Sequence, residues 1–314
     1  MAEANAYQGR RVLITGASGF IGRRLTRRLH ELGAEVEPVS RQSPPEDETR
    51  WHQVDLADPQ AVRPMVAAIK PDIAFHLASQ VTESRDRNVV LETFHANLAS
   101  AVYLLDALAE QGCKRIVQTG SLEEPEPGDP VSTPSSGYAA SKWGAAAYAR
   151  MFHSLWSTPV VLARLFMVYG PEQRDLTKVV PHVITSLLLG RDPQLSSGKR
   201  PVDWVYVDDV VEGLLALGIA SGVDGRQVDL GSGKLVPVRA VVEQIYAALA
   251  PERTIPFGGV PDHALEQVRV ARAEETGELL GWSPTVTLED GLARTVEWYR
   301  RELDAGNPAP VLSA

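Results

Sequence analysis

Residues 10–33 read RRVLITGASGFIGRRLTRRLHELG, and this stretch decides the fold of the chain. The apolar run 12–14 predicts a short buried strand, and apolar residues at helical spacing predict a helix that ends at Gly33. The turn between them carries three glycines at the spacing G-x-x-G-x-x-G, namely Gly16, Gly19 and Gly22.

The glycines of this turn have a physical purpose. A strand that turns sharply into a helix leaves unpaired backbone N–H groups and the positive end of the helix dipole facing one point. Without side chains there, the backbone can approach a diphosphate closely. A plain tight turn is the alternative, but the strand–turn–helix context favours a dinucleotide site. The residues expected to bind the cofactor here are Gly16, Ser18, Gly19, Phe20, Ile21 and Gly22.

Composition bounds the class of protein. The 314 residues are 44% hydrophobic and 23% charged, as in ordinary globular proteins, and their net charge of −9 argues against a nucleic-acid partner. Cys113 is the only cysteine, which excludes a disulfide framework and a thiolate metal cluster. His52, His95 and His153 lack the spacing of metal ligands, so no metal site is expected. With no apolar run of membrane length and no signal-peptide pattern, we expect a cytoplasmic enzyme without a membrane partner.

Strand and helix signals alternate through the first 170 residues. Strands are expected at 35–40, 51–54, 73–77, 115–118 and 160–165, and helices at 59–70, 88–111 and 137–156. Strands separated by helices on both faces predict an α/β fold with a doubly wound parallel sheet, a Rossmann domain over residues 1–170.

The remaining residues, 171–314, show a looser pattern. Their elements are shorter and they contain more proline and glycine, which predicts a smaller substrate-binding portion. A segment near 203–232 is expected to return to the main sheet, through the stretches 210–217 and 227–230.

Three polar residues are candidates for catalysis. Tyr138 and Lys142 are four apart at the start of an alanine-rich helix, so the ammonium can approach the phenol and lower its pKa. Ser121 follows the fifth strand, at the edge where a doubly wound sheet places its ligands, and can hold a carbonyl or alcohol oxygen beside Tyr138. An isolated Tyr-x-x-x-Lys pattern is usually a pair of exposed side chains without a catalytic role. Behind this glycine turn, the three together favour acid–base catalysis.

Six stretches are together typical of one family. They are TGASGFIG at 15–22, His76-Leu77-Ala78, the set Ser121/Tyr138/Lys142, R-x-x-x-x-Y-G-P at 164–171, V-x-V-D-D at 205–209 and L-G-W-x-P at 280–284. On these motifs the chain resembles the extended short-chain dehydrogenase/reductase family, the group of nucleotide-sugar epimerases, dehydratases and reductases. The resemblance covers nearly the whole chain.

The resemblance implies roles for the matching residues. Tyr138 is the acid/base, Lys142 binds the nicotinamide ribose and tunes Tyr138, and Ser121 orients the reacting oxygen. Further cofactor contacts are implied at Tyr138 itself and at Asp55, Leu56, Leu77 and Ala78, and a substrate contact at Ser79. Family members commonly pair the two helices expected at 88–111 and 137–156 with those of a second copy, so we expect a homodimer.

The segment after Ser121 departs from the family pattern. Family dehydratases carry an acidic or hydroxyl residue and then Glu there, whereas this chain has Leu122 and Glu123. Half of the elimination pair is therefore missing, and dehydration is not expected. Glu123 is a candidate substrate contact, because it follows Ser121 closely. Glu123, Glu124 and Glu126 together predict a mobile, solvated acidic loop.

The residues that bind the diphosphate of the substrate in this family are also partly replaced. Met167 replaces the family's Asn, and Val202 replaces the Arg before Asp203. The nearby cations Lys199 and Arg200 could supply the lost charge, although exposed cations in a loop are usually only solvated. Arg269 is a candidate for the second arginine. These changes weaken the family's implication of a nucleotide-sugar substrate.

The end of the second strand bears on the choice of cofactor. NAD-selective folds place an acid there, on the adenosine ribose, but this chain reads Val39-Ser40-Arg41. Ser40 can donate a hydrogen bond to a 2′-phosphate and Arg41 a charge-assisted one, unless Arg41 simply points to water. NADP is therefore favoured, and NAD stays possible.

Four functions remain open. The first is an NADP(H)-dependent ketoreductase acting on the 4-keto group of a nucleotide-activated deoxysugar, and the second is a nucleotide-sugar epimerase that holds NAD tightly. The third is a carbonyl reductase or alcohol dehydrogenase with a non-nucleotide substrate. The fourth, a protein that senses dinucleotide without catalysis, has no need of Ser121, Tyr138 and Lys142. His76, in a buried strand, is expected to be a packed core histidine rather than a base.

Overall fold

Seven parallel strands form the main sheet of the computed structural model, which describes residues 6–43, 50–82, 84–125, 133–262, 265 and 267–305. The strand order is β3-β2-β1-β4-β5-β6-β9. The strands are β1 (Arg11–Thr15), β2 (Glu35–Ser40), β3 (His52–Gln53), β4 (Ile73–His76), β5 (Arg115–Ser121), β6 (Val160–Leu165) and β9 (Gln227–Leu230). This order reverses between β1 and β4, which confirms the predicted doubly wound sheet.

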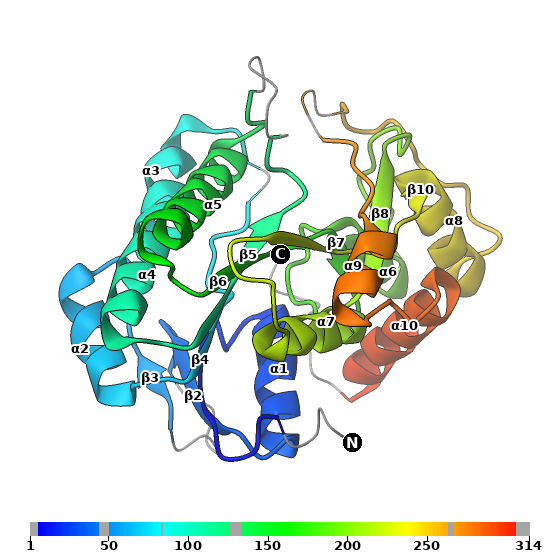
Figure 1. Ribbon diagram of the computed structural model, residues 1–314. Coiled ribbons are helices and arrows are strands. Elements are labelled where there is room, and N and C mark those ends of the chain that lie inside the picture. The colour runs from blue at the N-terminus through cyan, green and yellow to red at the C-terminus, as the bar shows by residue number, and fades with distance from the viewer. Residues whose placement is uncertain are drawn as a thin grey trace.

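Helices cover both faces of this sheet (Figure 1). One face carries α2 (Pro59–Ile69), α4 (Ser100–Gln111) and α5 (Gly137–Trp156), and the other carries α1 (Phe20–Glu31) and α7 (Val207–Ile219). Because successive side chains of a strand point to opposite faces, β1 feeds two cores. Val12 and Ile14 pack with α1 and α7, whereas Leu13 packs with α2 and α4.

The expected helix over 88–111 is wrong in its first half. That region contains a 3-10 turn η1 (Arg87–Val89), a short helix α3 (Val90–Thr93) and a π-helical segment η2 (Phe94–Ala99) before α4 begins. The Asn97 side chain is the physical reason. It donates to the Gln80 carbonyl and to Ser141 Oγ, and an extra residue in the turn aims it at these tertiary partners. The helix does end before Gly112, whose φ is 75°.

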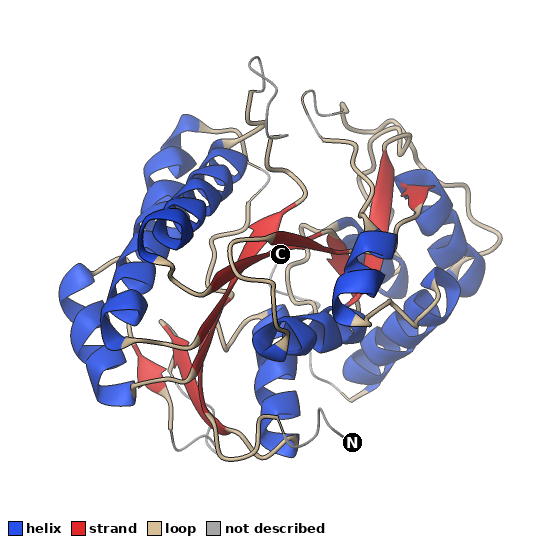
Figure 2. Cartoon of the chain, in the orientation of Figure 1, coloured by secondary structure: helices blue, strands red, loops and turns tan. Residues whose placement is uncertain are grey.

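A smaller sheet follows the sixth strand. It has the order β10-β8-β7, from β7 (Met167–Tyr169), β8 (Pro201–Tyr206) and β10 (Leu235–Pro237). The helices α6 (Val179–Leu188), α8 (Val238–Leu249) and α10 (Leu288–Asp304) share a third core with it, and α9 (Ala273–Leu280) packs near β9. Figure 2 shows α6, α8 and α10 gathered on the side of the smaller sheet.

The chain then returns to the main sheet at β9, which pairs with β6. The stretch 227–230 forms this strand, whereas the stretch 210–217 is not a strand but part of α7, which packs on the sheet. A buried ion pair ties the two strands, since Arg164 Nε and Nη2 each lie 2.8 Å from an oxygen of Asp229. Within the described ranges, no helix is both long and apolar enough to cross a bilayer.

Candidate active site

The glycine turn between β1 and α1 is built without room for side chains. Gly16 has a φ of 70°, and a Cβ on it would lie 2.7 Å from the Ala78 nitrogen. A Cβ on Gly22 would lie 2.1 Å from the Gly16 carbonyl oxygen. The cap residue of α1, Gly19, offers no side-chain hydrogen bond to the first N–H groups of the helix. These groups stay available for phosphate oxygens, so the turn fits a dinucleotide.

Two adjoining cavities open over this turn, of about 560 and 330 Å³. They share the glycine turn, Leu77 and Ser79. The larger one is also lined by Ser121, Tyr138 and Lys142, and the smaller one by Arg41, Asp55, Leu56 and Ala78. The described structure thus brings the predicted cofactor and catalytic residues to one continuous site at the carboxyl edge of the sheet.

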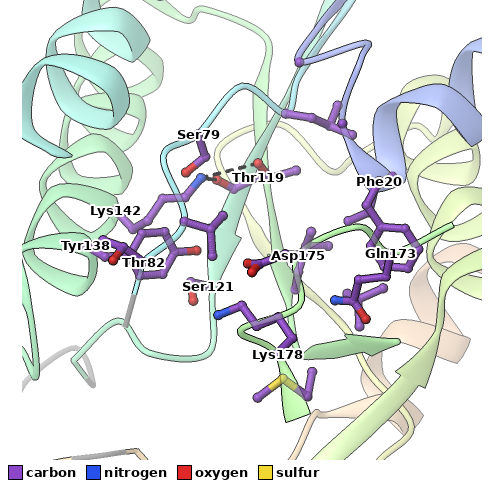
Figure 3. Close-up of a pocket in the computed structure, with 18 of the residues that line it drawn as sticks. Phe20, Ser79, Thr82, Thr119, Ser121, Tyr138, Lys142, Gln173, Asp175 and Lys178 are labelled. Atoms are coloured by element: carbon purple, nitrogen blue, oxygen red, sulfur yellow. Dashed lines mark hydrogen bonds between the residues drawn. The ribbon is translucent and has the colours of Figure 1, made fainter. Parts of the chain in front are cut away.

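The three predicted catalytic side chains come from two elements. Ser121 is the last residue of β5, which runs three residues further than expected, and the other two lie on α5 (Figure 3). The Ser136 hydroxyl caps α5 by accepting from the Ala139 nitrogen at 3.2 Å, which places Tyr138 in the first turn. Lys142 is only 7% exposed, and its Nζ donates to the Thr119 carbonyl at 2.9 Å.

The electrostatics of these side chains differ from the expectation. Burial raises the pKa of Tyr138 to about 12, the carboxylates of Glu124 and Glu123 act in the same direction, and the Ser121 hydroxyl opposes them. Burial lowers the pKa of Lys142 to about 8, against the pull of Glu124. The expectation that the ammonium lowers the pKa of the phenol is not met, because Lys142 is turned toward Thr119 in this structure.

The last residue of β2, where the strand meets the smaller cavity, is Ser40 and not an acid. Ser40 is buried, and its Oγ lies 2.7 Å from Ser18 Oγ and accepts from the Gln42 nitrogen at 3.1 Å. Arg41 is exposed and lines the smaller cavity together with Gln42. This lining leaves hydroxyl, amide and guanidinium groups where an NAD-selective fold has a carboxylate.

The predicted substrate contacts are only partly brought together. Ser79, Glu123, Met167 and Arg200 line the larger cavity. Arg200 crosses it, since its Nη2 donates to Glu123 Oε1 at 2.5 Å and to the Gln267 carbonyl at 2.7 Å.

Two predicted contacts do not line either cavity. The backbone nitrogen of Lys199 donates to Ser197 Oγ at 3.3 Å, within an exposed turn. Arg269 is buried, and its Nη1 donates to the Leu122 carbonyl at 3.1 Å. Arg269 therefore braces the chain next to Ser121 in this structure, rather than lining the cavity.

The expectation of a solvated acidic loop is wrong for Glu124. Its side chain is 2% exposed, and its Oε1 accepts from the Ser121 nitrogen at 2.7 Å. Burial raises its pKa, while the Ser121 N–H, Lys142, Arg164 and Arg150 oppose that rise. Glu126 lies outside the described residues. The acidic run thus contains one buried carboxyl directly behind the candidate serine.

Sequence reasoning missed a group of charged residues on the other wall of the cavity. Three of them, Arg174, Asp175 and Lys178, lie in the loop between β7 and α6, and the fourth, Arg23, lies on α1. Figure 3 shows Asp175 and Lys178 pointing into the space that Ser121 and Tyr138 face. For the three loop residues the signal was their position, because the loop follows Tyr-Gly-Pro at the carboxyl end of a strand.

His76 is buried at the end of β4, and its Nδ1 lies 2.8 Å from Thr15 Oγ1. Burial and the charge of Lys142 lower its pKa to about 3, so the ring is neutral at physiological pH. It has the surroundings of a packed core histidine. In the described part of the chain, no group of three or more His, Cys, Asp or Glu could hold a metal ion.

Comparisons with known proteins place this site in a family. A family model, "NAD dependent epimerase/dehydratase family", matches residues 12–231. A UDP-glucose 4-epimerase from Mycolicibacterium smegmatis is 29% identical, with 93% of this chain and 99% of that protein covered. A dTDP-glucose 4,6-dehydratase from an Actinoplanes species is also 29% identical, over 92% of this chain and 98% of that protein.

A solved structure agrees with these matches. The dTDP-glucose 4,6-dehydratase from Streptomyces venezuelae, with NAD and TYD bound, superposes with a TM-score of 0.83 at 25% identity. The match covers 95% of this chain and 99% of that one. The resemblance predicted from the motifs is confirmed: the chain belongs to the NAD dependent epimerase/dehydratase family, and it is an enzyme of the extended short-chain dehydrogenase/reductase type.

Proposed function

We propose that this enzyme is an NADP(H)-dependent ketoreductase that reduces the 4-keto group of a nucleotide-activated deoxysugar. The observation that carries the proposal is the end of β2, where Ser40, Arg41 and Gln42 line the smaller cavity and none of the three is a carboxylate. A carboxylate there would repel a 2′-phosphate, whereas a guanidinium offers it a charge-assisted hydrogen bond.

The cofactor would be held by the glycine turn, Ser40, Arg41, Asp55, Leu56, Leu77, Ala78 and Lys142. The nicotinamide ring supplies the hydride when it is bound. Ser121 Oγ orients the substrate oxygen, and the Tyr138 phenol gives that oxygen its proton. With a pKa of about 12, the phenol is protonated at neutral pH, which is the state that a proton donor needs. This supports the reducing direction.

The lining of the larger cavity supports a substrate that is partly anionic and partly apolar. Its charged lining has six cations against three carboxylates, namely Arg23, Arg85, Lys142, Arg174, Lys178 and Arg200 against Glu123, Glu172 and Asp175. Leu122 and Met167 contribute apolar surface close to Ser121. A phosphorylated carrier with a deoxygenated sugar meets both conditions. Leu122 in place of the dehydratase acid argues against elimination, so no dehydration product is expected.

Two assays test this function. The first offers a nucleotide-linked 4-keto-6-deoxyhexose with NADPH, and we expect the absorbance of the reduced nicotinamide to fall as product forms. The second offers unoxidised nucleotide hexoses without added cofactor, and we expect no reaction. Product in the second assay alone would overturn the reductase proposal.

A nucleotide-sugar epimerase with tightly held NAD is the second candidate. The similarity to a UDP-glucose 4-epimerase over 93% of this chain favours it. An epimerase interconverts sugars without net change of cofactor, so the second assay detects it directly. If no product forms in either assay, the result would favour the third candidate, a carbonyl reductase or alcohol dehydrogenase whose substrate carries no nucleotide. Met167 and Val202, which replace diphosphate-binding residues of the family, favour the same candidate.

We expect the unmodified protein to bind NADPH more tightly than NADH, and Arg41→Ala to erase most of that preference. Loss of one charge-assisted hydrogen bond costs about 1.5–3 kcal/mol, which is roughly a tenfold to hundredfold loss of NADPH affinity. Fluorescence titration of both cofactors measures it. Arg301→Ala, which removes an exposed arginine paired with Glu297 on α10, is the control. Equal affinity of the unmodified protein for both cofactors would contradict this prediction and support the epimerase.

We also propose a homodimer formed through α3, η2 and α5. Large apolar side chains are exposed along these neighbouring elements, with Leu91 69% exposed and Phe94 and Trp143 also uncovered. Light scattering at micromolar concentration should give about twice the chain mass of 34.1 kDa. The double variant Leu91→Glu/Trp143→Glu should be monomeric, whereas Leu235→Glu, an exposed apolar position on β10, should not change the mass. A monomeric unmodified protein would rule this interface out.

A further inference from the structure

Glu124 is a buried carboxyl that the proposed reaction does not use. It follows Ser121 by three residues, and its Oε1 accepts a hydrogen bond from the Ser121 backbone nitrogen at 2.7 Å. A Cβ on Gly120 would lie 2.6 Å from the same oxygen, so the glycine leaves the space that the carboxyl fills. A buried carboxyl is costly unless its hydrogen bonds and its charge are matched, so its presence behind a candidate catalytic residue needs a reason.

The groups that face Glu124 come from two elements besides its own segment. Helix α5 contributes Lys142, Arg150 and Tyr138, and β6 contributes Arg164. Arg164 is already matched by Asp229, with two contacts of 2.8 Å. Arg150 is only partly buried, whereas Lys142 is 7% exposed, and Glu124 is the one carboxylate of the described residues that acts on its charge. Lys142 is therefore the cation that depends most on Glu124.

We propose that Glu124 is a positioning residue, which fixes the Ser121 backbone and keeps Lys142 positively charged. The inference rests on the catalytic roles proposed for Ser121, Tyr138 and Lys142. Burial alone disfavours the ammonium, and a nearby carboxylate in a poorly hydrated site offsets that cost. Glu124 would thus extend the pH range over which the site has both a protonated phenol and a charged lysine.

Two variants separate the charge of Glu124 from its hydrogen bond. Glu124→Gln keeps an acceptor within reach of the Ser121 nitrogen but removes the charge. Glu124→Asp keeps the charge but shortens the reach to that nitrogen. The Glu124 carboxylate raises the pKa of both Lys142 and Tyr138. Its removal in Glu124→Gln should therefore shift the alkaline limb of the pH–rate profile to a pH about one unit lower. Glu124→Asp should reduce turnover while the limb stays in place.

A second measurement does not depend on activity. Acylation of Lys142 by a small water-soluble anhydride, followed across pH by mass spectrometry, reports the fraction of neutral amine. We expect a midpoint near pH 8 in the unmodified protein, a lower one in Glu124→Gln, and no change in the control Glu297→Gln on α10.

The outcomes are distinct. Equal limbs and equal labelling midpoints for Glu124→Gln and the unmodified protein would overturn the inference, because a purely structural carboxyl lowers stability without moving either. If Glu124→Gln does not fold, a labelling midpoint in Glu124→Asp that falls by a full unit would overturn it, and an unchanged midpoint would support it. The Tyr138→Phe variant, assayed alongside, distinguishes failure of the Glu124 proposal from failure of the proposed function. Full activity of Tyr138→Phe would contradict the catalytic roles themselves.

Discussion

Replacement of Tyr138 by phenylalanine is expected to lower turnover about a hundredfold or more, as for the loss of a general acid. The substitution removes the hydroxyl that faces the larger cavity near Ser121 and keeps the ring. Cofactor binding should change little, because the glycine turn and the residues on β2 are untouched. Steady-state rates together with a cofactor titration measure both effects.

A second tyrosine offers a matched control for this experiment. Tyr246 on α8 is buried in the core of the smaller sheet, and in the described part of the chain its hydroxyl has no hydrogen-bond partner. Tyr246→Phe therefore removes the same atom at a place remote from the site, and turnover should be unchanged. Near-normal turnover in Tyr138→Phe would show that the Ser121/Tyr138/Lys142 assignment is wrong.

Gly22→Ala is expected to destabilise the protein by about 3 kcal/mol and to abolish cofactor binding. The new Cβ would lie 2.1 Å from the Gly16 carbonyl oxygen and 3.0 Å from Ala17 Cα, and both belong to backbone that cannot rotate away. The turn and the start of α1 must therefore move apart. Denaturant unfolding and a cofactor titration measure the two consequences.

The control is a glycine on another helix. Gly277 on α9 has a helical backbone, and a Cβ there would meet only the Trp282 carbonyl oxygen at 3.7 Å, an ordinary contact. Gly277→Ala should be neutral or should stabilise the protein by up to about 1 kcal/mol, because alanine is the better helix former. If Gly22→Ala unfolds at the same denaturant concentration as the unmodified protein, the close packing of the turn does not contribute to the free energy of unfolding, and the prediction is wrong.

The sequence predicted the fold where local signals were sufficient. The strands Glu35–Ser40 and Val160–Leu165 and the helix Gly137–Trp156 have the expected bounds, because apolar runs and caps mark both of their ends. The π-helical segment Phe94–Ala99 could not be found in this way. It depends on Asn97 contacting Gln80 and Ser141, and these partners are distant in the chain.

The candidate site divides along the same line. The glycine turn and the spacing of Tyr138 and Lys142 are local patterns, and the structure places these residues around one cavity. The burial of Glu124 and its contact with the Ser121 nitrogen needed three-dimensional information, since an acidic run in a proline-bearing loop is usually solvated. The turn of Lys142 toward Thr119 likewise follows from the carbonyl that β5 offers, not from helical spacing.

The position of β9 has a consequence for synthesis of the protein. Arg164 on β6 is translated 65 residues before its partner Asp229. At a translation rate of 5–20 residues per second, the ribosome needs about 3–13 s to cover that interval. A sheet that forms within those seconds ends at β6, where the N–H and C=O groups that pair with β9 and the Arg164 side chain lack their partners. Open edges pair with strands of other chains, so a nascent sheet of this kind is exposed to aggregation until β9 is added.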